Sequence, residues 1–545
     1  MRVARTTRRA AAALVVGALA VGMGCSSDED EPATAGEDAG DANPVHTVPL
    51  PEEITRPDRE GNGIVAPQPS SPLPDGYVEE ELFVAGTATS FEAVDTPSDG
   101  RWTVTPADEA GYRTRVIVRR PANADDFSGT VVLEWFNVSA IEASPDWAYL
   151  STEIGRRGHA YVGVSAQQQG VEGGETLLDV ELDQDAAEQV DEDADTSGSG
   201  LKHVDPERYG SLGHPGDAWS FDIFSQVGRA VAESPGELLG DLQPEQVLAV
   251  GESQSAAFLS TLVNAVHPLD PVFDGFFVHS RGATPAPLDG VYRSSRDDRG
   301  ERDLAAEAVV IRDDLRVPVM LLIAETDLTL LGYAHARQDD TDLIRTWEVA
   351  GTAHADAHTL RTILGGPRDP SVGSLLGCDD PINTGPHHEV AQAALHHLVA
   401  WAAGGSAPPP AERIELVPGD DVVIARDERG NALGGVRTPL VDVPIATLTG
   451  EPRGTGPPSS PATAGCACCS ARRSRSTGRP SSSCTGARRT TSPRSGRPPT
   501  RRSMPGSCCR RTRSCWSGRL RRTGSCSAEP PVDPPGRETT SVVVR

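Results

Sequence analysis

Short apolar runs alternate with amphipathic stretches between about residues 77 and 404. The apolar runs predict strands at 112–119, 129–135, 160–165, 246–250, 275–279, 317–323 and 344–349. The amphipathic stretches predict helices at 146–157, 217–233, 254–266 and 389–402. Strands that alternate with helices pair in parallel through right-handed crossovers. The pattern therefore predicts an α/β fold with a mostly parallel central sheet and helices on both faces.

Two long polar segments interrupt this alternation. Residues 170–213 include ten acidic side chains and no basic one between Glu175 and Asp195, and residues 282–316 are also rich in charge. Insertions of this length in a compact domain are usually lids or binding loops, so both are predicted to be lid-like. For the acidic segment, a solvated surface excursion is an equal alternative.

The first 24 residues have the pattern of an export signal peptide. Four arginines among the first nine residues precede an apolar run at 10–22, which is too short for an ordinary transmembrane helix. The run stops at Gly22-Met-Gly-Cys25, which is similar to a bacterial lipobox, although leucine is usual where Gly22 stands. We expect cleavage after residue 24 and lipidation of Cys25. An ordinary secretory signal with an incidental cysteine is the alternative.

The segment 25–70 is predicted to link the lipid anchor to the folded domain. Residues 26–44 are rich in Asp, Glu, Ala and Gly, with no basic and no aromatic side chain. Such a segment cannot bury enough apolar surface to fold, and its like charges extend the chain. We therefore expect a disordered acidic linker. The protein is expected at the cell envelope, lipid-anchored on the outer side of a bacterial membrane, or secreted.

Charge is distributed unevenly along the chain. Of 50 basic and 78 acidic residues, 19 basic and 4 acidic ones fall within 451–545. The body formed by residues 1–450 therefore carries a net charge of about −43. Because nucleic-acid phosphates would be repelled by such a body, nucleic-acid binding is not expected. Contact with a membrane is expected only through the lipid anchor.

The tail 451–545 differs in composition from the rest of the chain. It is rich in Arg, Ser, Pro and Gly, has no hydrophobic periodicity and holds eight of the ten cysteines. Such a segment cannot form a core, so the tail is predicted to be disordered. A reading-frame shift in G/C-rich DNA is the other interpretation, because shifted codons over 466–473 and 480–486 can encode ordinary apolar sequence. The folded domain is then expected to span 71–450.

Gly251-Glu252-Ser253-Gln254-Ser255 lies where a predicted strand meets a predicted helix. This pentapeptide is one small residue away from the G-x-S-x-G elbow, since Ser255 stands where glycine is commonest. The elbow lifts a serine hydroxyl above the sheet edge and brings backbone segments too close for large flanking side chains. We therefore predict Ser253 as a nucleophile. A surface or helix-capping serine is the alternative.

A serine nucleophile needs a base to take its proton and a carboxylate to orient that base. In folds with this elbow the chain order is serine, acid, histidine. Asp327, just after the strand 317–323, is the predicted acid, with Glu325 as the competing candidate. His354, in a glycine-containing loop after the strand 344–349, is the predicted base, and His358 is the weaker candidate.

The oxyanion formed in acyl transfer needs two amide donors. Gln254, directly after the predicted nucleophile, is expected to supply one amide. Asn137 or Val138, in the loop after the strand 129–135, is expected to supply the other. No cluster of His or Cys has the spacing of metal ligands, and no phosphate-binding or dinucleotide motif occurs, so neither a metal nor a cofactor is expected.

Five segments resemble a family of bacterial α/β-hydrolase-domain proteins of mostly unassigned activity. They are EWFNV at 134–138, HPGD at 214–217, GESQS at 251–255, WEVAGTAH at 347–354 and GGVRTP at 434–439. The resemblance covers about residues 77–450. It implies the α/β-hydrolase fold, hydrolase chemistry and the three catalytic residues named above, but no particular substrate.

These features together predict an exported serine hydrolase that cleaves small-molecule or polymeric carboxylic esters through an acyl-enzyme. An acyltransferase or amidase with the same three residues is one alternative. A catalytically silent envelope lipoprotein that binds ligands is another.

Overall fold

The computed structural model describes residues 46–58, 73–174, 198, 200–291, 303–363, 381–419, 421–450 and 471–472. The predicted signal peptide, Cys25, the acidic stretch 175–195 and most of the tail lie outside these residues. Within the described part of the chain, no helix is long and apolar enough to cross a membrane.

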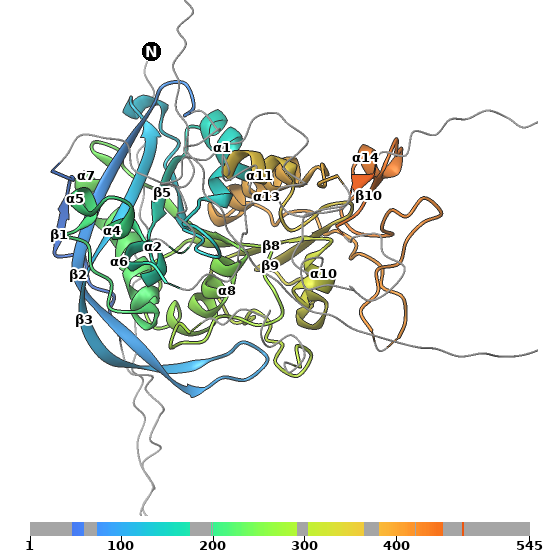
Figure 1. Cartoon of the computed structure of the whole chain (residues 1–545), viewed down its shortest axis with the longest axis horizontal. Coiled ribbons are helices and arrows are strands. Elements are labelled where there is room, and N and C mark those ends of the chain that lie inside the picture. Colours follow the sequence, from blue (N-terminus) through green and yellow to red (C-terminus); the bar gives the residue numbers. More distant parts are fainter. Residues whose placement is uncertain are drawn as a thin grey trace, which may run out of the picture. The chain divides into compact units, whose positions relative to one another are not determined.

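A mixed sheet forms the centre of the described structure (Figure 1). Its nine strands have the order β1-β2-β3-β5-β4-β6-β7-β8-β9 among the described residues. Their bounds are Glu53–Thr55, Tyr77–Asp95, Thr103–Pro121, Thr130–Trp135, Ala160–Val164, Gln246–Glu252, Gly275–His279, Val319–Ala324 and Ile344–Val349 for β1 to β9. The run from β5 to β9 is parallel, whereas β1, β2 and β3 join it in antiparallel pairs. The predicted mostly parallel sheet is confirmed.

Helices cover both faces of the sheet, as expected for buried parallel strands. On one face, α6 (Ser220–Glu233) and α8 (Gln254–Thr261) pack with the odd-numbered apolar residues of β4. On the other face, α1 (Pro145–Arg157) and α13 (His387–Ala402) pack against Val132 and its neighbours. Figure 1 shows α1 and α13 together and α6 with α8 across the sheet. Because successive strand residues point to opposite faces, a wholly buried strand such as β4 contributes side chains to both cores.

Shorter elements connect these layers. They are η1 Ala124–Asp126, α2 Gln168–Glu172, α4 Leu201–Val204, α5 Pro206–Tyr209, η2 Asp217–Trp219, α7 Gly236–Leu239, η3 Leu262–Val266, α10 Asp327–Leu330, η4 Tyr333–Ala336, α11 Ala357–Ile363 and α14 Pro439–Asp442. A separate antiparallel pair joins β10 (Thr447–Leu448) to β11 (Ala471–Arg472).

The start of the folded part differs from the sequence prediction. Residues 46–58 were assigned to the disordered linker, yet β1 pairs with β2 and Val48 is buried. His46 also contacts Asp222 of α6, with Nε2 and Oδ1 3.1 Å apart. The folded part therefore begins before residue 71. The short segment is ordered by partners that lie far along the chain, and its local composition gives no sign of them.

The outer edge of β2 is partly occupied by side chains of α6. The Thr89 amide donates to Oδ2 of Asp222 at 2.8 Å, and Nε2 of Gln226 donates to the Thr87 carbonyl at 2.8 Å. Backbone groups that a further strand would use are thus already bonded.

The described ends of the two polar insertions pack onto the β2–β3 hairpin. In the first insertion, Leu201 and Tyr209 form a small apolar cluster with Phe83 of β2. In the second, the Val310 amide donates to the carbonyl of Ser98, in the hairpin turn, at 3.0 Å. Residues 175–197, 199 and 292–302 of these insertions lie outside the described part, and the lid-like role of the insertions stays a prediction.

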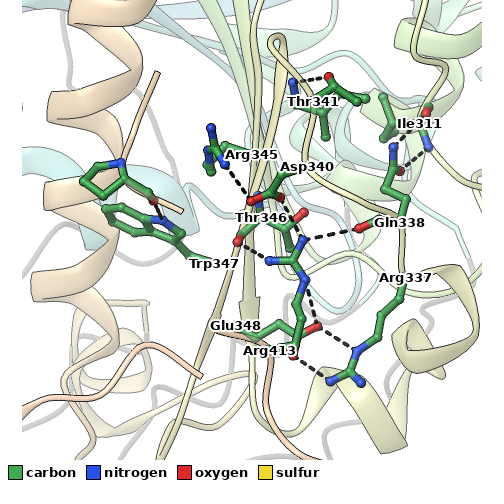
Figure 2. A network of polar contacts seen from close by, with 12 residues as sticks. Ile311, Arg337, Gln338, Asp340, Thr341, Arg345, Thr346, Trp347, Glu348 and Arg413 are labelled. Carbon is green, nitrogen blue, oxygen red and sulfur yellow. Dashed lines mark hydrogen bonds and ion pairs between the residues drawn. The ribbon is translucent and has the colours of Figure 1, made fainter. Parts of the chain in front are cut away.

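The opposite edge of the sheet, at β9, is covered by segments that precede and follow this strand in the chain (Figure 2). Arg413 donates to the Thr346 carbonyl at 2.6 Å and to Asp340 at 2.8 Å. Arg337 binds both carboxylate oxygens of the buried Glu348, at 2.8 and 2.6 Å. Val436 pairs with the end of β9 through two backbone hydrogen bonds. The strand that leads to His354 is therefore held on its outer side.

Candidate active site

Ser253 occupies a strained turn between β6 and α8. Its φ of 60° and ψ of −118° lie in a region that residues other than glycine rarely adopt. A side chain at Gly251 would begin 3.1 Å from the carbonyl group of Ser255, so the flanking positions must be small. The Ser253 amide donates to the carbonyl of His279 in β7 at 3.0 Å. This is the elbow geometry that the sequence predicted.

Ser253, His354 and Asp327 come together at the carboxyl ends of β6, β9 and β8. The Ser253 hydroxyl lies 2.7 Å from Nε2 of His354, and Nδ1 of His354 lies 2.7 Å from Oδ1 of Asp327. The other oxygen of Asp327 accepts from the Ala324 amide at 2.7 Å. Asp327 is buried, whereas Ser253 and His354 are partly exposed. The hydroxyl and the imidazole are thus the groups that a substrate can reach.

Glu325, the competing acid, faces away from His354. Its carboxylate accepts from the Gly351 amide at 2.7 Å and pairs with Arg426 at 2.8 Å. The hydroxyl of Thr449 donates to it at 3.1 Å. These contacts hold the loop before His354 and the segment near residue 450 in place, so Glu325 has a structural role.

His358, the competing base, lies on α11 away from Ser253. Its Nε2 contacts the carbonyl of Ala148 at 2.9 Å, and its ring stacks on that of His388 with centroids 3.9 Å apart. Of the two candidate histidines, His354 is therefore the one that contacts Ser253.

Glu252 is a further titratable residue, and it lies beside the hydrogen-bonded pair of Ser253 and His354. Its Oε1 is 3.7 Å from Nε2 of His354. Burial raises the pKa of Glu252 to about 8, and the nearby carboxylate of Asp327 opposes the attraction of His354. Burial would lower the pKa of His354, but the charge and hydrogen bond of Asp327, with the charge of Glu252, outweigh it and raise this pKa to about 9.

The loop after β4 requires a correction to the predicted oxyanion donors. The Asn137 amide donates to the Ala143 carbonyl at 2.9 Å, and the Asn137 side chain donates to the Glu252 carbonyl at 3.0 Å. The backbone N–H of Asn137 is therefore already bonded, and its side chain supports the peptide that leads into Ser253. The bridge to Ala143 arises from the path of the loop, which the local sequence did not reveal.

Val138, the other residue considered in this loop, remains close to the elbow. Its amide donates to Oε1 of Gln254 at 3.2 Å. The backbone amide of Gln254 is the first of α8, where a helix provides no acceptor of its own. The backbone amides of Gln254 and Val138 are therefore the two candidate donors that remain for an oxyanion.

Three residues near the site had no role in the sequence interpretation: Glu252, His279 and His387. Glu252 directly precedes Ser253, so its position in the predicted elbow already indicated that it lies near the site. His279 and His387 are fully buried, and their Nε2 atoms lie 2.9 Å apart. They are more than 100 residues apart in the chain, and no local pattern links them.

No group of three or more His, Cys, Asp or Glu side chains among the described residues is placed to hold a metal ion. The polar contacts of the Ser253 hydroxyl lead to His354 and, through its imidazole, to Asp327.

Solved structures with similar folds include several esterases. One of two fungal esterases from Rhizomucor miehei is 11% identical, with 61% of this chain and 86% of that chain covered at a TM-score of 0.28. Acetyl xylan esterase 1 from Thermoanaerobacterium sp. JW/SL YS485 is 10% identical, with 55% and 89% covered at 0.26. A thermostable esterase from Pseudomonas putida ECU1011 is 12% identical, with 57% and 84% covered at 0.25. At these TM-scores the similarities say nothing of the substrate.

A search of curated proteins found no relative of this chain. Residues 48–474 match the family model described as alpha/beta hydrolase domain. The match begins before and ends after the range 77–450 over which the sequence motifs showed the resemblance. It spans the whole sheet, the elbow and the loops that carry Asp327 and His354. The chain therefore belongs to the alpha/beta hydrolase domain family.

Proposed function

We propose that this protein is a serine hydrolase that cleaves carboxylic esters through an acyl-enzyme. The observation that carries the proposal is the continuous hydrogen-bonded chain from Ser253 through His354 to Asp327, with its serine on a strained elbow. Serine is a weak nucleophile unless a neighbouring base accepts its proton, and this chain supplies both the base and the group that orients it.

The first half of the reaction forms the acyl-enzyme. Oγ of Ser253 attacks the ester carbonyl carbon while its proton passes to Nε2 of His354. The carbonyl oxygen becomes an oxyanion, which the amides of Gln254 and Val138 stabilise. The bond to the alcohol oxygen then breaks, and that oxygen takes the proton from His354. Asp327, bonded to Nδ1 of His354, stabilises the imidazolium that exists between these two transfers.

The second half regenerates the enzyme. A water molecule attacks the acyl carbonyl carbon and gives a proton to His354. The second tetrahedral intermediate collapses, Oγ of Ser253 leaves and recovers the proton, and the carboxylic acid departs. If an alcohol or amine replaces water, the same steps transfer the acyl group, so product analysis with added alcohol separates a hydrolase from an acyltransferase.

In the resting structure the Val138 amide is bonded to the side chain of Gln254. We propose that the substrate oxyanion replaces this side-chain oxygen as the acceptor. The buried amide then has an acceptor both with and without substrate, which avoids the cost of an unbonded buried donor.

Labelling with a fluorophosphonate probe tests the proposal. We expect covalent labelling of the full chain and none in the Ser253→Ala variant. Ser255→Ala is the matched control, because Ser255 lies two residues away and its hydroxyl has no hydrogen bond within the described structure. Labelling that is independent of Ser253, or none in either protein, contradicts the proposal and favours a silent ligand-binding protein. Hydrolysis rates over short, long, aromatic and polymeric esters then define the substrate class.

Export and lipid anchoring at Cys25 also remain proposals. They rest on the pattern of the first 25 residues alone, and the catalytic proposal does not depend on them.

A further inference from the structure

A second polar chain lies behind the catalytic one and is fully buried. Nδ1 of His279 lies 2.8 Å from Oδ1 of Asp146, and Nε2 of His279 lies 2.9 Å from Nε2 of His387. Nδ1 of His387 lies 3.2 Å from the carbonyl oxygen of Ala353, the residue before His354. None of these three side chains takes part in the steps proposed above. Buried polar groups are stable only with hydrogen-bond partners, and a buried network of this kind fixes the positions of its members.

The last contact fixes the direction of every hydrogen bond in the chain. A carbonyl oxygen only accepts, so Nδ1 of His387 must carry a hydrogen. In a neutral imidazole the other nitrogen is then an acceptor, so Nε2 of His387 accepts from an N–H at Nε2 of His279. Nδ1 of His279 is in turn an acceptor, and the donor to it is a protonated carboxyl of Asp146.

Burial supports this neutral arrangement. It lowers the pKa of His279 to about 3 and that of His387 well below its usual value, and it raises the pKa of Asp146 well above its usual range. An ion pair between Asp146 and His279 would satisfy the same contacts, but it would place two charges where water is excluded. Oδ2 of Asp146 has no hydrogen bond within the described residues, as suits a carboxyl that is not ionised.

The chain connects the two halves of the catalytic pair. On the side of the elbow, the backbone carbonyl of His279 accepts from the Ser253 amide at 3.0 Å, so the residue between Asp146 and His387 also holds the nucleophile. At the other end His387 holds the peptide that precedes His354. The ring of Tyr149 packs against both imidazoles, with centroids 4.9 and 4.7 Å away, and limits their rotation.

We propose that His279, His387 and Asp146 are positioning residues that set the distance between Ser253 and His354. This inference rests on the proposed function, because it assigns a role relative to the catalytic pair. His387 contacts both the carbonyl of Ala353 and His279 of β7. The loop that carries His354 is therefore held in a fixed position relative to the elbow. Misplacing a catalytic group by about 1 Å can cost on the order of 100-fold in rate, so such a support has a measurable value.

Two substitutions of His387 separate its two nitrogens. Asn places a donor where Nδ1 lies and keeps the bond to Ala353, whereas Gln places its amide near Nε2 and keeps only the bond to His279. We expect His387→Asn to be labelled by a fluorophosphonate at nearly the wild-type rate. We expect His387→Gln to be labelled about 10- to 100-fold more slowly. His396→Asn, on the exposed side of the same helix, is the matched control and should not differ from wild type.

Steady-state hydrolysis of 4-nitrophenyl acetate gives a measurement that would not change if the role of His387 were purely structural. For His387→Gln we expect kcat to fall with KM retained, while the thermal midpoints of the two His387 variants stay similar. Equal rates for the two variants overturn the inference, as does a wild-type rate for His387→Gln. If the wild-type protein itself is not labelled, the proposed function fails instead. Nitrogen-15 NMR of labelled histidine then still tests the chain, and a hydrogen on Nε2 of His387 contradicts it.

Discussion

Oε1 of Glu252 lies 3.7 Å from Nε2 of His354, the nitrogen that also contacts the Ser253 hydroxyl. A general base acts only when it is neutral, and the pKa of His354 is raised to about 9. We therefore expect kcat/KM for an ester to rise with pH and to reach half its maximum on the alkaline side, near pH 9. A pH profile with its midpoint near the ordinary value for histidine would contradict this assignment.

Glu252→Gln should move that midpoint to lower pH. The substitution removes one of the charges that raise the pKa of His354, so more of the imidazole is neutral at a given pH. The measurement is kcat/KM across neutral and alkaline pH for both proteins. Glu233→Gln, an exposed carboxylate in α6, is the matched control and should leave the profile unchanged. A midpoint that stays fixed or rises in Glu252→Gln would show that Glu252 does not act on His354.

Asp327→Asn should lower kcat by about ten-thousand-fold without unfolding the protein. The amide preserves shape, but it no longer favours the imidazole tautomer and charge that the reaction needs. Glu325→Gln is the informative comparison, because Glu325 pairs with Arg426 and the Gly351 amide. We expect that variant to lose about 1–3 kcal/mol of stability and to keep most of its kcat. The reverse pattern in urea unfolding and kinetics would make Glu325 the catalytic acid.

Val138→Pro tests the second oxyanion donor. Proline has no backbone N–H, so the proposed donor is removed, and loss of one such donor typically costs about 10²–10³-fold in kcat. Val138→Ala keeps the amide and controls for the lost apolar contacts. The two variants are compared by kcat and by thermal unfolding. Equal kcat values in two folded proteins would exclude the Val138 amide from the oxyanion site.

Arg413→Met tests the cover of the β9 edge. The substitution keeps an apolar stem but removes the hydrogen bonds to the Thr346 carbonyl and to Asp340. We expect a loss of about 1–3 kcal/mol, measured as a lower urea midpoint. Arg101→Met breaks an exposed pair with Asp313 and should leave the midpoint unchanged. If the two variants unfold alike, the β9 network adds no more than a surface ion pair.

Cys25→Ser tests the proposed anchor. In a bacterial host the full chain should incorporate labelled palmitate and sediment with membranes, and the variant should do neither. Export without palmitate in the parent protein would indicate an ordinary secretory signal.

The main layers of the fold were predictable because their signals are local. The apolar runs at 275–279 and 344–349 coincide with β7 and β9, and the elbow appears in five adjacent residues. The residues 46–58 and most of β2 were missed because they pair with each other and with α6 across long stretches of chain. Their sequences hold many polar residues and lack the clear alternation that marks a half-buried strand.

The candidate site was predictable in its residue types and less so in its contacts. Asp327 and Glu325 both follow β8, and only the tertiary partners of Glu325, such as Arg426, distinguish them. The Asn137 amide was predicted to be an oxyanion donor, but the loop bends back and bonds it to Ala143. The buried pair His279 and His387 forms only when α13 packs on the sheet, so neither local sequence predicts it.

The covering of the two sheet edges affects how readily copies of the protein can aggregate. On one side β1 is only three residues long, and Asp222 and Gln226 occupy backbone groups of β2 beyond it. On the other side Arg413 and Val436 occupy backbone groups of β9. Over the described residues, these contacts shorten the row of free amides and carbonyls that each edge offers to a second molecule. A second copy that meets either edge therefore finds fewer backbone groups with which to add a strand and begin a fibre.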